Sequence, residues 1–173
     1  MFAYVLNNIV QYLIAPGVEF TIDGVTYPGN WIQLSSTAEQ QSLGIYEVVY
    51  GQQPNDQYYW VSPLPAVFEN NQVVINFTST PKDLVTVQST SVNNINQQAY
   101  SLLQPTDWMV IRSVESGGVY PVPQSWNTWR ATIRTQAATA ANAVTASTTV
   151  DQVAAVFPVA WAASPDTPVQ VQE

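Results

Sequence analysis

The sequence predicts a two-part α+β chain, in which an all-β sandwich or small barrel is followed by an α-helical domain. Short β-branched and aromatic runs fill residues 1–80, with turn residues roughly every eight to twelve positions. From Pro81 onward the apolar residues recur with a helical period. The length of 173 residues allows two small domains, so we assign residues 1–80 to the first and residues 81–173 to the second.

The strands of the first domain are expected on either side of dipeptides that tolerate positive φ and suit two-residue hairpin turns. Between them, Ser36 and Glu39 have the spacing of a capping box, which predicts one or two helical turns that end at Gly44. The three turn dipeptides are Asn7-Asn8, Asp23-Gly24 and Asn70-Asn71. The expected strands span residues 1–6, 9–14, 18–22, 25–27, 45–50, 58–61, 67–69 and 73–78.

The first helix of the second domain is expected at about residues 81–104. Thr80 can cap it, Pro81 fits its first position and Pro105 stops it. Residues 106–123 contain Gly117-Gly118 and two prolines, which predicts a connector. Residues that recur every seven positions predict the buried stripe of this helix, namely Val85, Val92, Ala99, Gln88, Ile95 and Leu102.

Two further helices are expected at about residues 125–146 and 149–157. Ser125 caps the first of them, and Thr149 or Asp151 caps the second. The residues after Pro158 are rich in proline and should be loose, including residues 169–173 at the end. The stripe predicted to be buried in the helix at 125–146 comprises Trp126, Trp129, Ile133, Ala137, Ala140 and Val144.

The chain is poor in charge, and this excludes several classes of function. Only 9% of the residues are charged, where about 25% is usual, and the net charge is −8. The first base is Lys82, so we expect no binding to nucleic acid and no attraction to an anionic membrane. The apolar stretch at residues 153–163 is interrupted by Pro158 and is too short to span a bilayer, and the first residues do not resemble a signal peptide.

Catalytic and metal-binding signals are absent from the sequence. The chain has no Cys and no His, which removes thiolate chemistry and the commonest general base and metal ligand. Its carboxylates share no motif of a glycosidase, and Asp23-Gly24 lacks the other oxygen ligands of a calcium loop. We therefore expect a protein that is not an enzyme and that holds no cofactor and no metal.

Residues 135–150 contain no charged side chain, although one face of this helix should meet water. One interpretation is an Ala-rich helix that tolerates water. The other is that small residues let a second helix approach closely, either from the same chain or from another copy.

The stretch from Gln97 to Arg134 contains an ordered string of residues, namely Thr106, Asp107, Trp108, Arg112, Glu115, Val122, Pro123, Trp126, Trp129, Arg130 and Arg134. With these residues it resembles the C-terminal region of the tail fibre assembly chaperones of tailed bacteriophages. In that family a Leu-rich helix ends at Thr-Asp-Trp, and an Arg, a Glu-x-Gly, a Val/Ile-Pro turn and a helix of the form Trp/Thr-x-x-Tyr/Trp-Arg-x-x-x-Arg follow. Residues 43–84 resemble the family loosely, the first forty residues do not, and Trp129 stands where Tyr is usual.

The resemblance implies a chaperone that binds the distal part of a phage tail fibre protein and assists its folding and trimerisation. It implies a protein of the host cytoplasm during phage assembly, and a homo-oligomer for which a trimer is favoured. The alternatives are a permanent baseplate or tail fibre component of the virion, and a receptor- or glycan-binding module.

The candidate site residues have both structural and functional interpretations. Asp107 can cap a helix or pair with Arg112 or Arg130. Arg130 and Arg134 either belong to such a local network or contact the fibre. Trp108, Trp126, Trp129 and Met109 are expected in the core. The aromatic run Tyr58, Tyr59 and Trp60 places rings on both sides of a strand, so it serves either as ordinary packing or as an anchor for a partner.

Overall fold

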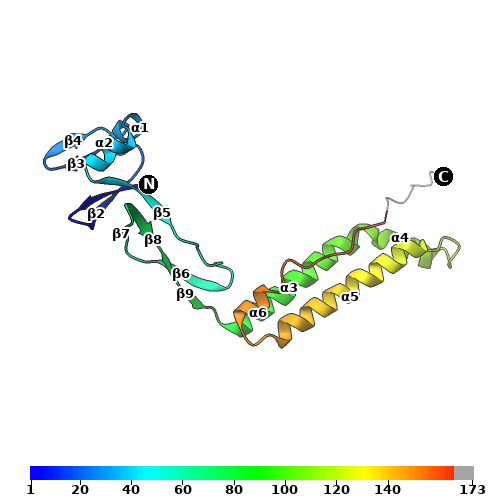
Figure 1. The fold of residues 1–173 in the computed structure, drawn as a ribbon. Helices are drawn as coiled ribbons and strands as arrows, with labels where there is room; N and C mark the ends of the chain where they lie inside the picture. The colour runs from blue at the N-terminus through cyan, green and yellow to red at the C-terminus, as the bar shows by residue number, and fades with distance from the viewer. Residues whose placement is uncertain (166–173) are drawn as a thin grey trace. The chain divides into compact units, whose positions relative to one another are not determined.

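The computed structural model describes residues 1–165, which fall into two compact units separated between Thr80 and Pro81. The first unit is a β-sheet region and the second is helical, as the sequence predicts (Figure 1). The elements of the first unit are β1 (Phe2–Leu6), β2 (Ile9–Ile14), β3 (Phe20–Ile22), β4 (Val25–Tyr27), α1 (Trp31–Leu34), α2 (Thr37–Ser42), β5 (Ile45–Tyr50), β6 (Tyr59–Pro63), β7 (Val67–Glu69), β8 (Gln72–Ile75) and β9 (Phe77–Pro81).

The main sheet of the first unit has five strands in the order β2-β1-β5-β8-β7 and curls as a half-barrel. Its pairs are antiparallel except for β5 with β8, which run parallel. Two further pairs, β3 with β4 and β6 with β9, form separate ribbons. The first unit also contains two short helices, α1 and α2. Helix α1 has no side-chain cap, and the sequence does not predict it.

The predicted hairpin turns are confirmed by their backbone angles. Both residues of each turn have positive φ, with 51° and 62° at Asn7 and Asn8 and 49° and 62° at Asn70 and Asn71. These angles match the turn type whose twist fits the flanking strands. The capping box is also present, because the Ser36 backbone N–H donates to Glu39 at 2.7 Å and the Ser36 hydroxyl accepts from the Glu39 N–H.

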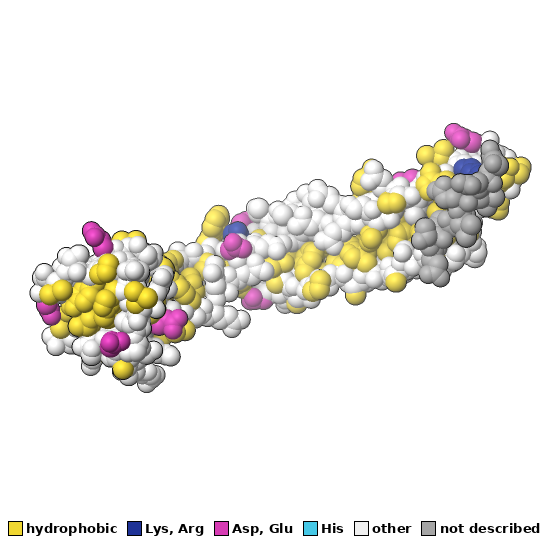
Figure 2. Space-filling view, turned by 90° about the horizontal axis from the view of Figure 1, so that it is seen from above, with side chains coloured by type: hydrophobic (Ala, Val, Ile, Leu, Met, Phe, Trp, Pro, Cys, Tyr) yellow, Lys and Arg dark blue, Asp and Glu magenta, His cyan; other side chains and the backbone are white. Residues whose placement is uncertain are grey.

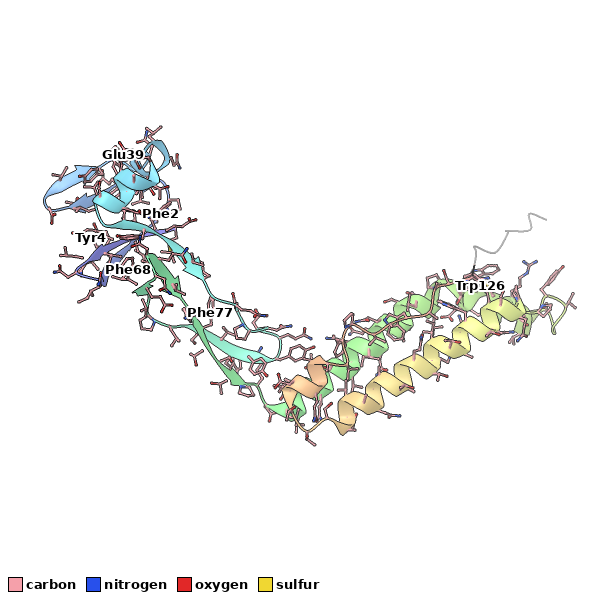
Figure 3. The ribbon with its side chains drawn as sticks, viewed as in Figure 1. Phe2, Tyr4, Glu39, Phe68, Phe77 and Trp126 are labelled. Atoms are coloured by element: carbon pink, nitrogen blue, oxygen red, sulfur yellow. The ribbon has the colours of Figure 1, made fainter. Side chains whose placement is uncertain are left out.

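The main sheet buries side chains on both of its faces, because successive residues of a strand point to opposite sides. Tyr4 packs against Phe20 and Ile32, so the β3–β4 ribbon and α1 cover one face (Figure 3). Ala3 and Val5, the neighbours of Tyr4, belong to a second cluster on the other face with Val48, Val73 and Ile75.

The helical unit begins with α3 (Leu84–Leu103), which starts three residues later than predicted. Pro81 ends strand β9, and Asp83 rather than Thr80 caps the helix by accepting from the Thr86 N–H at 2.8 Å. Strand pairing with β6 therefore overrides the helix-start signal at Thr80-Pro81. The buried positions are Val87, Ser91, Ile95 and Ala99, whereas Val85 is 72% exposed, so the predicted stripe is only partly correct.

The expected connector at residues 106–123 contains a helix. A short 3₁₀ turn, η1 (Gln104–Thr106), has Pro105 in its first turn and leads into α4 (Asp107–Glu115). Proline is tolerated there because the first residues of a helix lack a hydrogen-bond partner for their N–H. The Gly117-Gly118 turn, with positive φ at both residues, follows α4.

The remaining helices are α5 (Gln124–Ala146) and α6 (Val150–Ala154). Pro123, not Ser125, stands at the N-cap of α5, and it makes no side-chain cap. Thr149 caps α6 as predicted, accepting from the Gln152 N–H at 3.3 Å. Every residue of the stripe predicted for α5 is buried, namely Trp126, Trp129, Ile133, Ala137, Ala140 and Val144.

Helices α3 and α5 lie side by side along their length (Figure 1). Small buried residues, Ser91 on α3 with Ala137 and Ala140 on α5, let the two backbones approach closely. The Gln88 side-chain amide of α3 donates to the carbonyls of Val144 and Ser147 at 3.1 and 2.9 Å. An amide therefore binds carbonyls at the end of α5, where a Lys or Arg is common.

Candidate functional site

Three residues of the motif, Thr106, Asp107 and Arg130, meet at one end of the helical unit. The Arg130 side chain is only 5% exposed. Its guanidinium donates to the Leu103 carbonyl at 3.0 Å, to the Thr106 hydroxyl, and to the Asp107 carboxylate at 2.6 Å. The predicted pairing of Asp107 with Arg130 is therefore present, and it joins α5 to the junction of η1 and α4. These groups enclose Arg130. Of its two predicted roles, a local network or contact with the fibre, the geometry corresponds to the local network.

The two tryptophans of α5 lie in the core beside this network. Trp126 and Trp129 are buried and contact each other edge to face, with ring centroids 5.4 Å apart. Figure 3 labels Trp126. Met109 is buried as predicted. Trp108 is not, since 44% of it is exposed on α4, so its assignment to the core was wrong. The helix turns Trp108 outward because its neighbour Met109 takes the position that faces the core.

Several large apolar side chains of α4 and the following turn face outward. Trp108, Ile111 and Val114 are spaced three residues apart, so they lie on neighbouring turns of one helical face. Val119 and Tyr120 belong to the turn, which the Tyr120 N–H ties to the Ser116 hydroxyl at 3.2 Å. We call these residues the α4 surface: Trp108, Ile111, Val114, Val119 and Tyr120, all of them exposed.

The other two arginines of the motif are nearer the surface. The Arg112 guanidinium lies over the Tyr120 ring, 4.2 Å from its centroid, so it packs against the α4 surface. Arg134 is exposed on α5. Of the two arginines considered for fibre contact, Arg134 is thus the accessible one. Few charged side chains appear over the helical unit in the view of Figure 2.

The aromatic run of the first unit is divided between core and surface, although not by strand alternation. Tyr58 is buried in the turn before β6, where its N–H donates to the Asn55 carbonyl at 3.1 Å. Burial raises the pKa of the Tyr58 hydroxyl above its ordinary value of 10.0. Tyr59 is half-buried on β6, and Trp60 is 68% exposed. Trp60 is the most exposed of the three.

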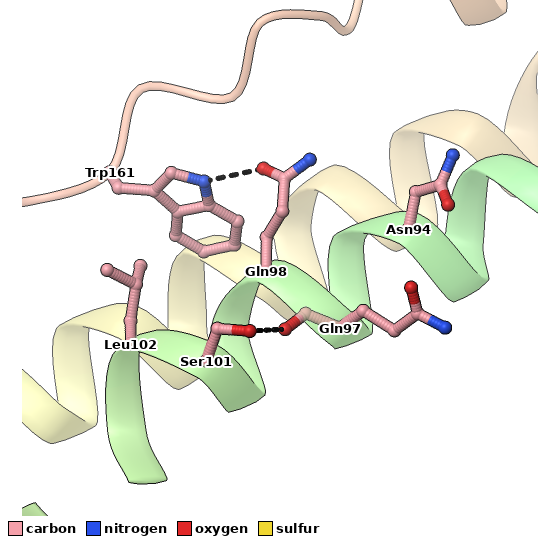
Figure 4. A pocket seen from close by; sticks show the side chains of 6 residues that line it. All are labelled: Asn94, Gln97, Gln98, Ser101, Leu102 and Trp161. Atoms are coloured by element: carbon pink, nitrogen blue, oxygen red, sulfur yellow. Dashed lines mark hydrogen bonds between the residues drawn. The ribbon is translucent and has the colours of Figure 1, made fainter. Parts of the chain in front are cut away.

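Residues after α6 form a non-helical strap along α3 and α5, although the sequence predicts a loose tail from Pro158 onward (Figure 4). The Gln136 amide of α5 donates to the Ala160 carbonyl and accepts from the Ala162 N–H, both at 3.0 Å. The Trp129 indole N–H donates to the Ala162 carbonyl at 3.0 Å. We call residues 159–162 the strap. The expectation for residues 169–173 lies outside the described part of the chain.

The strap also borders a hollow on α3. The Trp161 indole N–H donates to the Gln98 side-chain carbonyl at 2.9 Å (Figure 4). The hollow beside it has a volume of about 520 Å³ and contains no charged group. Its lining consists of Asn94, Gln97, Gln98, Ser101, Leu102 and Trp161.

Sequence reasoning missed both the α4 surface and the strap. The spacing of Trp108, Ile111 and Val114 is an amphipathic signal, but the glycines and prolines that follow drew attention to a connector instead. For the strap no local signal exists, because Gln136 is distant in sequence from the backbone groups that it binds.

The described chain offers no obvious metal or membrane-spanning element. Within residues 1–165 no group of three acidic side chains could hold a metal ion, and no helix has the length and apolarity to cross a bilayer. No protein-family model matches the sequence, and neither a curated protein nor a solved structure matches the chain.

Proposed function

We propose that this protein is a tail fibre assembly chaperone of a tailed bacteriophage. It binds the distal part of a tail fibre protein in the host cytoplasm and keeps it soluble until its chains trimerise. The proposal assigns the chain no catalytic step, cofactor or metal, and no nucleic-acid or membrane partner. It includes self-association through the helical unit. A homotrimer is favoured because such fibres are trimeric, so each copy of the chaperone can bind one fibre chain.

The observation that carries the proposal is the α4 surface. A contiguous set of exposed apolar side chains marks a contact site for another protein, whereas single exposed apolar residues are common on any protein surface. Trp108, Ile111 and Val114 form such a set within the stretch that resembles the chaperone family. Tryptophan and tyrosine are favoured anchors at protein interfaces, and the α4 surface offers one of each.

The composition supports the same function. An intertwined β fibre has many contacts between distant residues and exposes strand edges before assembly, so it folds slowly and aggregates. A protein that covers such edges needs apolar and amide surface, because charged groups would have to lose their water on binding. The chain has 9% charged residues and a surface rich in Asn, Gln, Ser and Thr.

The test is co-expression with the tail fibre protein encoded next to this chain. We expect soluble, trimeric fibre only when the chain is present, and insoluble fibre when Ile111→Asp and Val114→Asp replace two residues of the α4 surface. Val85→Asp is the control, because Val85 on α3 is about as exposed as Val114 and its replacement should leave the fibre soluble. Fibre that is equally soluble without the chain would contradict the proposal.

Mass spectrometry of purified virions separates the chaperone from the structural alternative. A chaperone that is released should be missing from virions or present far below the fibre. A stoichiometric amount would identify a permanent virion component instead. Binding of a glycan array by the chain, lost on Trp60→Ala, would favour a receptor-binding module.

A further inference from the structure

The strap is held as a bound peptide is held, through its backbone. An amide side chain carries both a donor and an acceptor, so Gln136 satisfies the Ala160 carbonyl and the Ala162 N–H at the same time. The Trp129 indole adds a third bond to the strap backbone, at the Ala162 carbonyl. Within the strap, Trp161 is the residue bound through its side chain, to Gln98. We call the surface formed by Gln98, Trp129 and Gln136 the groove. It binds a non-helical backbone with one tryptophan between two alanines.

The groove contacts come from both long helices and carry no charge. Gln98 belongs to α3, and Trp129 and Gln136 belong to α5. The segment from Phe157 to Pro165 is uncharged as well. The hollow beside Trp161 continues the groove along α3, with the amides of Asn94 and Gln97 on its wall. The strap thus fills only part of a longer amide-lined surface.

We propose that this groove is a separable peptide-binding site, and that it takes the strap of a second copy of the chain in place of its own. The strap of another copy has the same sequence and can make every contact described above, so the exchange conserves the bonds on both sides. Copies of a chain with a net charge of −8 repel each other, but residues 135–150 and 157–165 are uncharged and can meet without bringing charges together. This inference rests on the self-association included in the proposed function.

The link between α6 and the strap is consistent with exchange. Helix α6 ends at Ala154, and residues 155–158 connect it to the strap. The bonds in this link are local, from the Val156 N–H to the Val153 carbonyl and from the Phe157 N–H to the Ala154 carbonyl, both at 3.1 Å. These backbone bonds lie within the link and the end of α6, so a change in the path of the link breaks none of the bonds that hold the strap to α3 and α5.

A labelled peptide of residues 157–165, followed by fluorescence anisotropy, tests the site on the full-length chain. The resident strap competes at an effective concentration in the millimolar range, so binding to the unchanged chain should be weak. Trp161→Ala weakens the resident strap, and the apparent Kd of the peptide should fall by about tenfold or more. Adding Gln136→Leu should abolish the gain, whereas adding Thr139→Ala, on the exposed face of α5, should keep it.

If the Trp161→Ala chain remains folded and no peptide binds, the groove is not a separable site and the inference is wrong. If that variant unfolds, Trp161→Phe replaces it, because this change removes the indole donor of the resident strap alone and keeps an aromatic ring. Equal binding of a scrambled peptide would contradict the assignment of the second copy's strap as the occupant.

Cross-linking tests the exchange between copies, since the chain has no cysteine of its own. One chain carries Gln98→Cys and another carries Trp161→Cys, and a short bismaleimide is added to their mixture. We expect a cross-linked pair in the mixture and little in either chain alone. A chain with both substitutions that cross-links internally while the mixture does not would overturn the exchange. The chaperone proposal survives that result, because fibre solubility is measured separately.

Discussion

Arg130 is a buried charge, and the acceptors around its guanidinium offset the free-energy cost of burying it. An ion pair that loses one partner leaves the other charge uncompensated, which is far more costly than replacing both by apolar groups. Here the Asp107 side chain is 46% exposed, so water screens part of the interaction.

We predict that Asp107→Asn lowers the free energy of unfolding by about 1–2 kcal/mol, measured by urea denaturation. Adding Arg130→Met should recover part of the loss, because methionine fills a similar volume without a charge. An unchanged midpoint for Asp107→Asn would show that the carboxylate contributes nothing to the network.

The tryptophans of the motif should differ in their effect on stability. Trp126→Ala or Trp129→Ala should each cost about 3–5 kcal/mol, since each removes a buried ring from the core of the helical unit. Trp108→Ala should cost less than about 1 kcal/mol and should instead impair fibre binding. Circular dichroism during urea denaturation measures the stability of each variant, and co-expression with the fibre measures binding. A large loss for Trp108→Ala would mean that the ring supports α4 rather than a partner.

At the scale of elements, two helices are held at their N-termini by carboxylates. The Ser36 backbone N–H and hydroxyl donate to Glu39 and lower its pKa below the ordinary value of 4.5. The Thr86 hydroxyl and N–H donate to Asp83 and lower its pKa below 3.8. A lowered pKa in the folded state means that the folded chain holds its proton less tightly than the unfolded chain does.

The stability supplied by these caps should be fully present above about pH 5 and lost as the pH falls through the lowered pKa values. Glu39→Gln with Asp83→Asn should therefore reduce the loss of stability between about pH 5 and 3, as followed by urea denaturation at each pH. Glutamine can still accept in a capping box, so the helices should persist. Parallel loss in the variant and the unchanged chain would contradict this assignment.

The elements that the sequence predicted correctly are those set by neighbouring residues. The Asn7-Asn8 and Asn70-Asn71 turns, the capping box at Ser36 and the stripe of α5 follow from local geometry alone. The start of α3 did not, because pairing of β9 with β6 places Pro81 in a strand. The strap did not either, because an amide on α5 recognises a backbone segment that no periodic pattern marks.

In the whole molecule, amide side chains make hydrogen bonds that charged side chains often make in other proteins. Gln88 binds the last carbonyls of α5, Gln136 binds the strap, and Gln98 binds Trp161. Such contacts leave surfaces that another protein can cover without displacing the tightly held water of a charge. The outward face of α5 within residues 135–146 is one surface of this kind.

Self-association through that face is the prediction that depends on the assembled molecule. We expect light scattering to give three times the 19.0 kDa of one chain, and Thr139→Lys with Asn142→Lys to yield monomers. Both residues are exposed on α5, and a trimer that buried them would bring lysines from every copy together at a cost that dissociates it. Asn96→Lys, at an exposed position of α3, is the matched control and should leave the mass unchanged. A trimer that persists with both lysines would place the contact elsewhere, and a monomeric unchanged chain would contradict self-association itself.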